Sequence, residues 1–405
     1  MSLGTTRPAD TYSPLYFLAS LGAGGVAVTF FMFLVFWVPH PNQPVPVFED
    51  IASAFSGGPF VMQAAIAVAI LGIAVFAYLN LKSLIWNLKA FRVFKATEAY
   101  ATLRQSNAEA SLLALPLALA MSVNVLFIIG LVFVPQLWSV VEFLFPLAMI
   151  AFAGIGALAL KMIGAFLGRV LSIGGAFDLS AHNSFAQLLP AFSIAMVGVG
   201  FAAPAAMSTQ PGTVATALIL STFFAVVAVV YTLFAAITAL VSMLQHGTAR
   251  EAAPTLTIIV PLITVLGILF MRQSHGLHVV FDVHTQPGEM MLFLTRLLAI
   301  QVAFLLLGAV VMLRQGYFTD YVLGSQTSPG SYALVCPAVA LSVMVHFFAN
   351  KGLVDAGAIE KFSVAYWGVT AIALVAQVVA IALLLRLNRQ HFAKRNVPNT
   401  MVPAE

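Results

Sequence analysis

Ten long apolar segments constrain this chain more than any other feature of its sequence. Each is close to the roughly 20 residues that a helix needs to cross a bilayer. They cover residues 14–38, 59–85, 111–133, 139–166, 185–207, 213–243, 254–271, 290–313, 331–350 and 362–387. No linker or change of composition between them marks a second domain. The sequence therefore predicts an all-α integral membrane protein, with ten transmembrane helices in a single domain of residues 1–405.

The composition is typical of a chain that lies in lipid. Hydrophobic residues make up 61% of it and charged residues 8%, whereas a soluble domain has roughly 25% charged residues. The formal net charge of +4 is spread over ten spans and provides no clustered basic face. We therefore expect the lipid bilayer, and no nucleic acid, as a partner.

The basic residues predict the orientation. Of the 18 Lys and Arg residues, only Arg272, Lys351 and Lys361 follow odd-numbered spans, and Arg296 lies inside the eighth span. The others follow even-numbered spans or lie in the two terminal segments. By the positive-inside rule, both termini are cytoplasmic and the chain is a multi-pass protein of the cell (inner) membrane.

An internal repeat relates the odd-numbered spans. In three of them a proline is followed, eleven residues later, by a phenylalanine. The pairs are Pro116 and Phe127, Pro190 and Phe201, and Pro337 and Phe348. The seventh span has Pro261 with Arg272 at the eleventh position, and the first has Ser20 with Phe31. The very short connections after the third and fifth spans predict five helical hairpins. The repeat predicts an inner ring of five kinked helices (spans 1, 3, 5, 7 and 9) surrounded by five outer helices. The amino ends of the inner helices, which carry partial positive charge, would favour an anion at the inner mouth.

Short motifs in the first and ninth spans carry a resemblance to a known family. They are Tyr16-Phe17 followed by Ser20-Leu21-Gly22, and Pro337, Ala340, Ser342 and Val343. With the ten-span arrangement, the chain resembles the tellurite-resistance and C4-dicarboxylate transporter (TDT) family, which includes the plant slow anion channels. The resemblance implies a pore of five inner helices, anion conduction or transport, and a homotrimer.

The chain departs from that family at Cys336, its only cysteine. In the family, a phenylalanine before the proline of the ninth span plugs the pore. A thiol is far smaller than a phenyl ring, so this plug is absent here. Cys336 is then either a small buried apolar residue or a reactive group, as in the similar TsoY (seleno)protein branch, whose relatives can carry selenocysteine.

Other side chains are candidates for the path of an anion. Asn124, in the middle of the third span, is a pore-lining donor or an interhelical hydrogen-bonding residue. Phe31, Phe127, Phe201 and Phe348 form an apolar gate or pack between helices. Arg296 is a candidate for binding the substrate or a residue that extends to the membrane surface.

Histidines near the outer side suggest an alternative function. His275, His278 and His284 follow the seventh span, and His346 lies in the ninth. Imidazole binds zinc, copper and haem iron, so the alternative is a membrane redox, haem-binding or metal-binding protein that uses these histidines and Cys336. No recognised metal motif or nucleotide-binding loop is present. The leading prediction is a channel or secondary transporter for small inorganic or organic anions, rather than an enzyme, with no cofactor.

Overall fold

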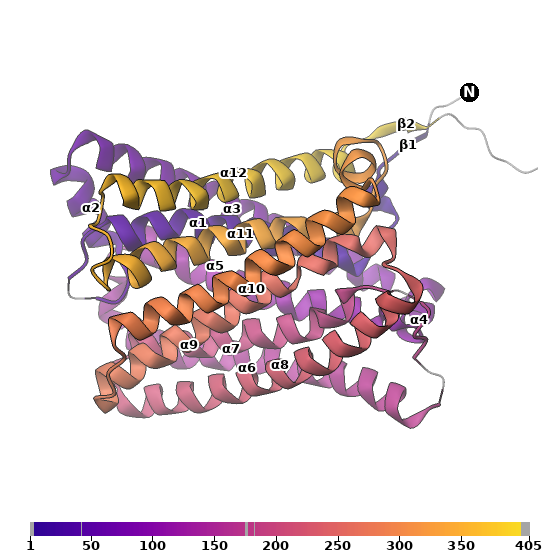
Figure 1. Cartoon of the computed structure of the whole chain (residues 1–405), viewed down its shortest axis with the longest axis horizontal. Coiled ribbons are helices and arrows are strands. Elements are labelled where there is room, and N and C mark those ends of the chain that lie inside the picture. The colour runs from indigo at the N-terminus through magenta and orange to yellow at the C-terminus, as the bar shows by residue number, and fades with distance from the viewer. Residues whose placement is uncertain (1–3, 42, 175–176, 182, 398–405) are drawn as a thin grey trace, which may run out of the picture.

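The computed structural model describes residues 4–397 except 42, 175–176 and 182. It is 84% helical. Within the described residues, ten helical segments are long and apolar enough to cross a membrane, and each coincides with one predicted span. The prediction of an all-α membrane protein with ten spans is confirmed at this level. Figure 1 shows these helices running lengthwise, side by side, through the molecule.

The spans are built on ten long α-helices. In chain order these are α1 (Phe17–Trp37), α3 (Phe60–Phe94), α5 (Ala114–Phe133), α6 (Val141–Ser172), α7 (Leu189–Met207), α8 (Pro211–His246), α9 (Ile259–Phe281), α10 (Pro287–Arg314), α11 (Val335–Phe347) and α12 (Val364–Phe392). Two shorter helices, α2 (Phe48–Gly57) and α4 (Glu98–Arg104), lie in connections. The strands β1 (Gly4–Thr6) and β2 (Arg395–Val397) pair antiparallel. This pairing holds both ends of the described chain at one end of the bundle (Figure 1).

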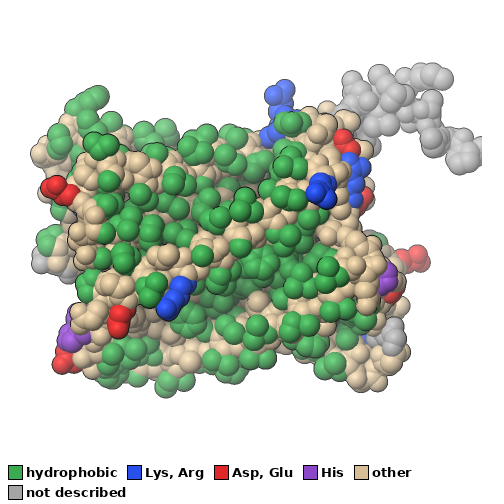
Figure 2. Space-filling view, viewed as in Figure 1, with side chains coloured by type: hydrophobic (Ala, Val, Ile, Leu, Met, Phe, Trp, Pro, Cys, Tyr) green, Lys and Arg blue, Asp and Glu red, His purple; other side chains and the backbone are tan. Residues whose placement is uncertain are grey.

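Burial separates the odd-numbered spans from the even-numbered ones. In the most apolar part of each odd-numbered span, between 67% and 94% of the residues are buried, against 17% to 33% in the even-numbered spans. Among the odd-numbered spans, α1 contacts α5, α5 contacts α7, α7 contacts α9, α9 contacts α11, and α11 contacts α1. Each also contacts the even-numbered helix that follows it. Figure 2 shows hydrophobic side chains over most of the visible face, with the charged ones mostly near its two ends.

Buried amides attach outer helices to inner ones. Asn80 of α3 donates from Nδ2 to the carbonyl oxygen of Ser20 at 2.8 Å, and the hydroxyl of Ser20 donates to the carbonyl oxygen of Asn80 at 2.9 Å. On the other side of the bundle, Gln301 of α10 donates to the Thr264 hydroxyl of α9 at 2.6 Å. Because lipid offers no alternative partner, such pairs fix the register of neighbouring helices.

A short 3₁₀ turn precedes each odd-numbered span. The turns are Pro14–Tyr16, Asn107–Leu113, Phe185–Leu188, Arg250–Thr257 and Pro329–Leu334. Four of them begin after a serine whose hydroxyl accepts the backbone N–H two residues later: Ser13, Ser106, Ser184 and Ser328. A serine is a favoured residue at the start of a helix for this reason. The shared turn extends the internal repeat beyond the prolines.

The repeated prolines lie where this turn passes into the α-helix. Pro190 is the second residue of α7, and Pro116, Pro261 and Pro337 are the third residues of α5, α9 and α11. The N–H groups in the first turn of a helix have no intrahelical acceptor, so a proline there, which lacks the N–H, costs no hydrogen bond. These prolines mark where each α-helix begins, and that they kink the inner helices stays a prediction.

A glycine lets α3 pack closely against α1. A Cβ atom at Gly72 would overlap the ring of Phe30, which stacks on Phe76 one turn further along α3. We expect Gly72→Ala to lower the free energy of unfolding by about 1–3 kcal/mol, as overpacking does. Chemical or thermal unfolding in detergent would measure this.

Gly154→Ala is the matched control, since Gly154 is also helical and no atom lies near its added Cβ. Helix propensity alone should leave this variant unchanged or about 0.5–1 kcal/mol more stable. Equal stability of the two variants would contradict the close packing at Gly72.

Candidate functional site

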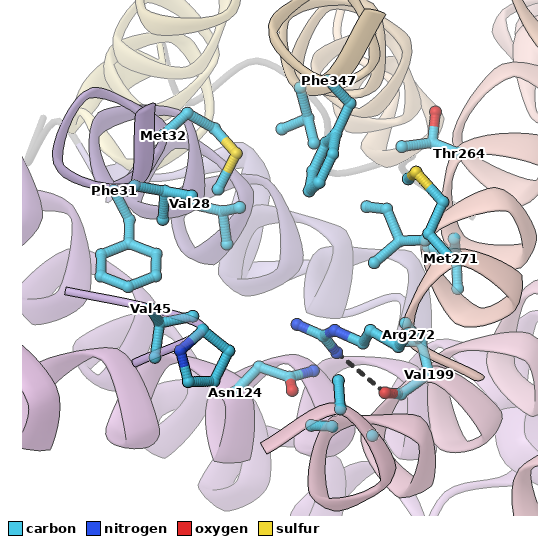
Figure 3. A pocket seen from close by; sticks show the side chains of 18 of the residues that line it. Val28, Phe31, Met32, Val45, Asn124, Val199, Thr264, Met271, Arg272 and Phe347 are labelled. Carbon is cyan, nitrogen blue, oxygen red and sulfur yellow. Dashed lines mark hydrogen bonds between the residues drawn. The ribbon is translucent and has the colours of Figure 1, made fainter. Parts of the chain in front are cut away.

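A cavity of about 780 Å³ lies among the odd-numbered spans. All five of them, α1, α5, α7, α9 and α11, contribute residues to its wall, with fewer from α6 and α10. Most lining side chains are aliphatic, aromatic or methionine, and a few polar groups lie among them (Figure 3). A large, mainly apolar cavity with a few placed polar groups is typical of a ligand-binding site.

The cavity extends along much of the inner helices. Its wall on α1 runs from Leu21 to Phe36, about 22 Å at 1.5 Å per residue. Near the amino ends of the odd-numbered spans, the lining residues Gly22, Pro261 and Cys336 are buried. Near the carboxyl ends, the lining residues His278 and Lys351 are exposed. The cavity is therefore open at the carboxyl ends and closed at the amino ends.

Arg272 is the polar residue that dominates the interior of the cavity. Figure 3 shows its guanidinium directed into the cavity from α9. Its Nη1 donates to the carbonyl oxygen of Val199, on α7, at 2.9 Å. Among the described residues it forms no ion pair with any carboxylate. A guanidinium has five N–H donors, so most of its hydrogen-bonding capacity faces the cavity.

The apolar run predicts a seventh span of residues 254–271, which excludes Arg272. The helix α9 continues to Phe281 and therefore includes Arg272. The apolar pattern stops at Arg272 because polar side chains follow on α9 that do not face lipid. Arg272 faces the cavity, and Gln273 donates to Ser221 of the neighbouring helix α8 at 2.8 Å. One signal could have found Arg272, since it occupies the repeat position that holds phenylalanine in the other odd-numbered spans.

Asn124 lies across the cavity from Arg272. It lines the wall on α5, and Figure 3 shows its amide directed towards the guanidinium. Its Nδ2 donates to the carbonyl oxygen of Ala120, one turn earlier, at 3.2 Å. Thr264 also lines the wall, but its hydroxyl is engaged by Gln301 and by the carbonyl oxygen of Val260 at 3.0 Å. The Nδ2 of Asn124 also donates to the sulfur of Met196 at 3.8 Å, so Arg272 is the main hydrogen-bond donor that faces the interior.

The structure brings some of the predicted gate residues together and not others. Phe31, Phe127, Pro261 and Cys336 line the cavity together with Asn124. Pro116, Pro190 and Pro337 lie in the buried first turns of their helices.

Two of the predicted phenylalanines pack elsewhere. Phe201 stacks on Phe224 of α8, with ring centroids 5.4 Å apart. Phe348 lies beside Gly352, one turn further along the chain, while its neighbour Phe347 lines the cavity. The fixed eleven-residue spacing therefore does not select the residues that face the cavity.

Arg296, a candidate either for binding the substrate or for extending to the membrane surface, lies away from the cavity. It is exposed on α10, an outer helix, and it is not among the residues that line the described cavity. Its side chain can extend along the apolar surface while its charge stays in water. The interior cation is Arg272, and not Arg296.

The histidines separate into two places. His275, His278 and His284 line the open end of the cavity. The Nδ1 atoms of His278 and His284 are 2.5 Å apart, and Nε2 of His284 is 2.9 Å from an oxygen of Asp282.

His346 is buried in a separate place, against the rings of Phe33, Phe36 and Trp37. It lies ten residues from Cys336 on α11, about 15 Å along the axis. The described residues contain no group of three His, Cys, Asp or Glu side chains that could hold one metal ion. A site for a metal or haem therefore stays a prediction.

Accessibility to a polar thiol reagent should distinguish Phe347 from Phe348. In a Cys336→Ser background, which has no other thiol, we expect Phe347→Cys to react with an anionic methanethiosulfonate at least tenfold faster than Phe348→Cys. The reason is that only Phe347 lines the cavity. Labelling rates in nanodiscs, followed by mass spectrometry, would measure the difference. Equal rates would contradict the position of the cavity wall.

Comparison of the chain with models of protein families, with curated proteins and with solved structures finds no match. Membership of the TDT family, the homotrimer and the anion specificity that it implies are therefore untested by these comparisons. What the cavity can bind has to be argued from the side chains that line it.

Proposed function

We propose that this protein is an anion channel or secondary transporter whose path is the cavity between its odd-numbered spans. The observation that carries the proposal is Arg272, a guanidinium inside a membrane-spanning helix that faces a large cavity and has no carboxylate partner among the described residues. An intramembrane cation of this kind marks a functional site by default.

The energetics of the guanidinium favour an anion as its partner. The guanidinium is partly buried, it faces the cavity, and it has no carboxylate partner among the described residues, so a ligand in the cavity can compensate its charge. An anion that enters the cavity would supply the compensating negative charge. It would also accept hydrogen bonds from the guanidinium N–H groups that do not donate to the Val199 carbonyl oxygen. Asn124 lies beside the same part of the cavity (Figure 3), with its Nδ2 donating to the Ala120 carbonyl oxygen and to the sulfur of Met196.

The arrangement of the spans supports an inner ring around the path. Contacts run in sequence through α1, α5, α7, α9 and α11 and return to α1, and all five helices line the cavity. We propose that the even-numbered helices surround this ring as outer members of five hairpins. The closed end lies at the amino ends of the inner helices, where the helix dipoles add partial positive charge. Transport requires this end to open.

The proposal includes the family resemblance and its implications. A chain of the TDT type would place both termini in the cytoplasm of the cell (inner) membrane and would form a homotrimer. The 3₁₀ turn before each of the five odd-numbered helices and the division into buried and exposed spans support five equivalent units. Cys336, in place of the plugging phenylalanine, lines the closed end of the cavity.

Replacing Arg272 tests the proposal most directly. We expect Arg272→Gln to reduce anion flux into proteoliposomes at least tenfold at subsaturating anion, because hydrogen bonds to a charged group contribute about 1.5–3 kcal/mol. Arg272→Lys should retain part of the flux, since it keeps the charge and loses the planar fork. Flux of nitrate and of short carboxylates would be measured with an anion-sensitive dye or by isotope uptake.

Arg296→Gln is the matched control, because it removes an arginine from the exposed surface of α10 and should leave flux unchanged. Thermal unfolding supplies a second readout. Without anion, Arg272→Gln should be at least as stable as the wild type, and an added anion should stabilise the wild type alone. Wild-type flux from an Arg272→Gln protein that is folded would overturn the proposal.

The absent plug gives a separate prediction. Cys336→Phe places a phenyl ring at the closed end of the cavity, so we expect flux to fall, while Cys336→Ser, which adds no volume, should retain it. The same flux assay would measure both variants. Unchanged flux through Cys336→Phe would remove position 336 from the path.

A further inference from the structure

We infer that the anion bound in this cavity is an amphipathic organic monoanion, with its charged group at Arg272 and its apolar part along the walls formed by α1 and α11. The inference rests on the proposed function and names the substrate class of the same site.

The charges that line the cavity match one negative charge. Arg272 and Lys351 are the lining residues with a permanent positive charge. Lys351, at the open end, is paired with Asp355, another lining residue, at 3.2 Å. Arg272 is therefore the one uncompensated permanent cation among the lining residues. A dicarboxylate would carry a second negative charge into an apolar region that offers it no cation.

The wall around the guanidinium is apolar. Figure 3 shows Val28, Phe31 and Met32 of α1 and Phe347 of α11 lining the same cavity as Arg272. From Arg272 to Pro261 at the closed end, α9 spans about 16 Å. The polar side chain of α9 that lines this stretch, Thr264, already has its hydroxyl engaged by Gln301 and Val260. This part of the wall therefore offers water few hydrogen-bonding partners and favours contact with the hydrocarbon part of a ligand.

The size of the cavity exceeds what an inorganic anion needs. A halide occupies a volume close to that of one water molecule, about 30 Å³, whereas the cavity measures about 780 Å³. Cavities of roughly 300–1,000 Å³ with apolar walls are typical for ligands with an apolar body. An anion with a hydrocarbon tail would fill the apolar part and displace water from it.

A chain-length series tests the inference. Binding of butyrate, pentanoate, hexanoate, succinate and nitrate to the wild-type protein in nanodiscs would be measured by isothermal titration, with empty nanodiscs subtracted. We expect affinity to rise about fourfold for each added methylene, so that hexanoate binds roughly 15-fold more tightly than butyrate. Succinate should bind more weakly than hexanoate. Hexylammonium, which has a cationic head on an apolar tail, should not bind in the cavity.

Variants separate this inference from the proposed function. Arg272→Gln should weaken hexanoate at least tenfold, and Arg296→Gln, on the outer surface, should not. If nitrate binds through Arg272 but affinity is independent of chain length, or if succinate binds best, the substrate class is wrong and the proposed function stands. If no anion in the series binds in a way that depends on Arg272, both are wrong.

Discussion

Lipid cannot accept or donate hydrogen bonds, and the rest of this structure depends on that constraint. Outer helices meet it with apolar surfaces, so their few buried amides, such as Asn80 and Gln301, are directed inward to partners on inner helices. The inner helices are buried on nearly all sides and can carry groups that lipid would exclude. One consequence is that a long apolar helical segment can carry Arg272, because this residue faces a cavity and not the bilayer.

The same constraint connects stability with function in the cavity. The repeated 3₁₀ turns and first-turn prolines start the inner helices at a common level, which places the buried lining residues of α1, α9 and α11 together at the closed end. Further along, Arg272 introduces a charge that the carboxylates of the described residues leave uncompensated. An anion bound in the cavity would compensate this charge and complete the site.

Much of the fold could be predicted from hydrophobicity, and little of the site could. The spans were predictable because apolar length is dictated by bilayer thickness, and the span 185–207 agrees with the structure at both ends. The end of α9 was not predictable from hydropathy. Hydropathy measures affinity for lipid, whereas Arg272 faces a cavity and therefore does not need to be apolar. Phe347 and Phe348 are adjacent phenylalanines, and only packing decides that the first lines the cavity. Arg296 is charged and within a span like Arg272, yet its helix is an outer one. The repeat does distinguish these two arginines, because Arg272 holds the eleventh position after the proline of an odd-numbered span and Arg296 lies in an even-numbered one.

The most direct test of the account is to locate a bound anion. 4-Bromobenzoate combines a single carboxylate, an apolar body and an unreactive bromine, so its position can be found from anomalous diffraction of co-crystals. The account predicts a bromine peak within the cavity, with density for the carboxylate at the guanidinium of Arg272, and the loss of both in Arg272→Gln. A cavity that is empty at saturating 4-bromobenzoate, or a peak that is unchanged in Arg272→Gln, would contradict it.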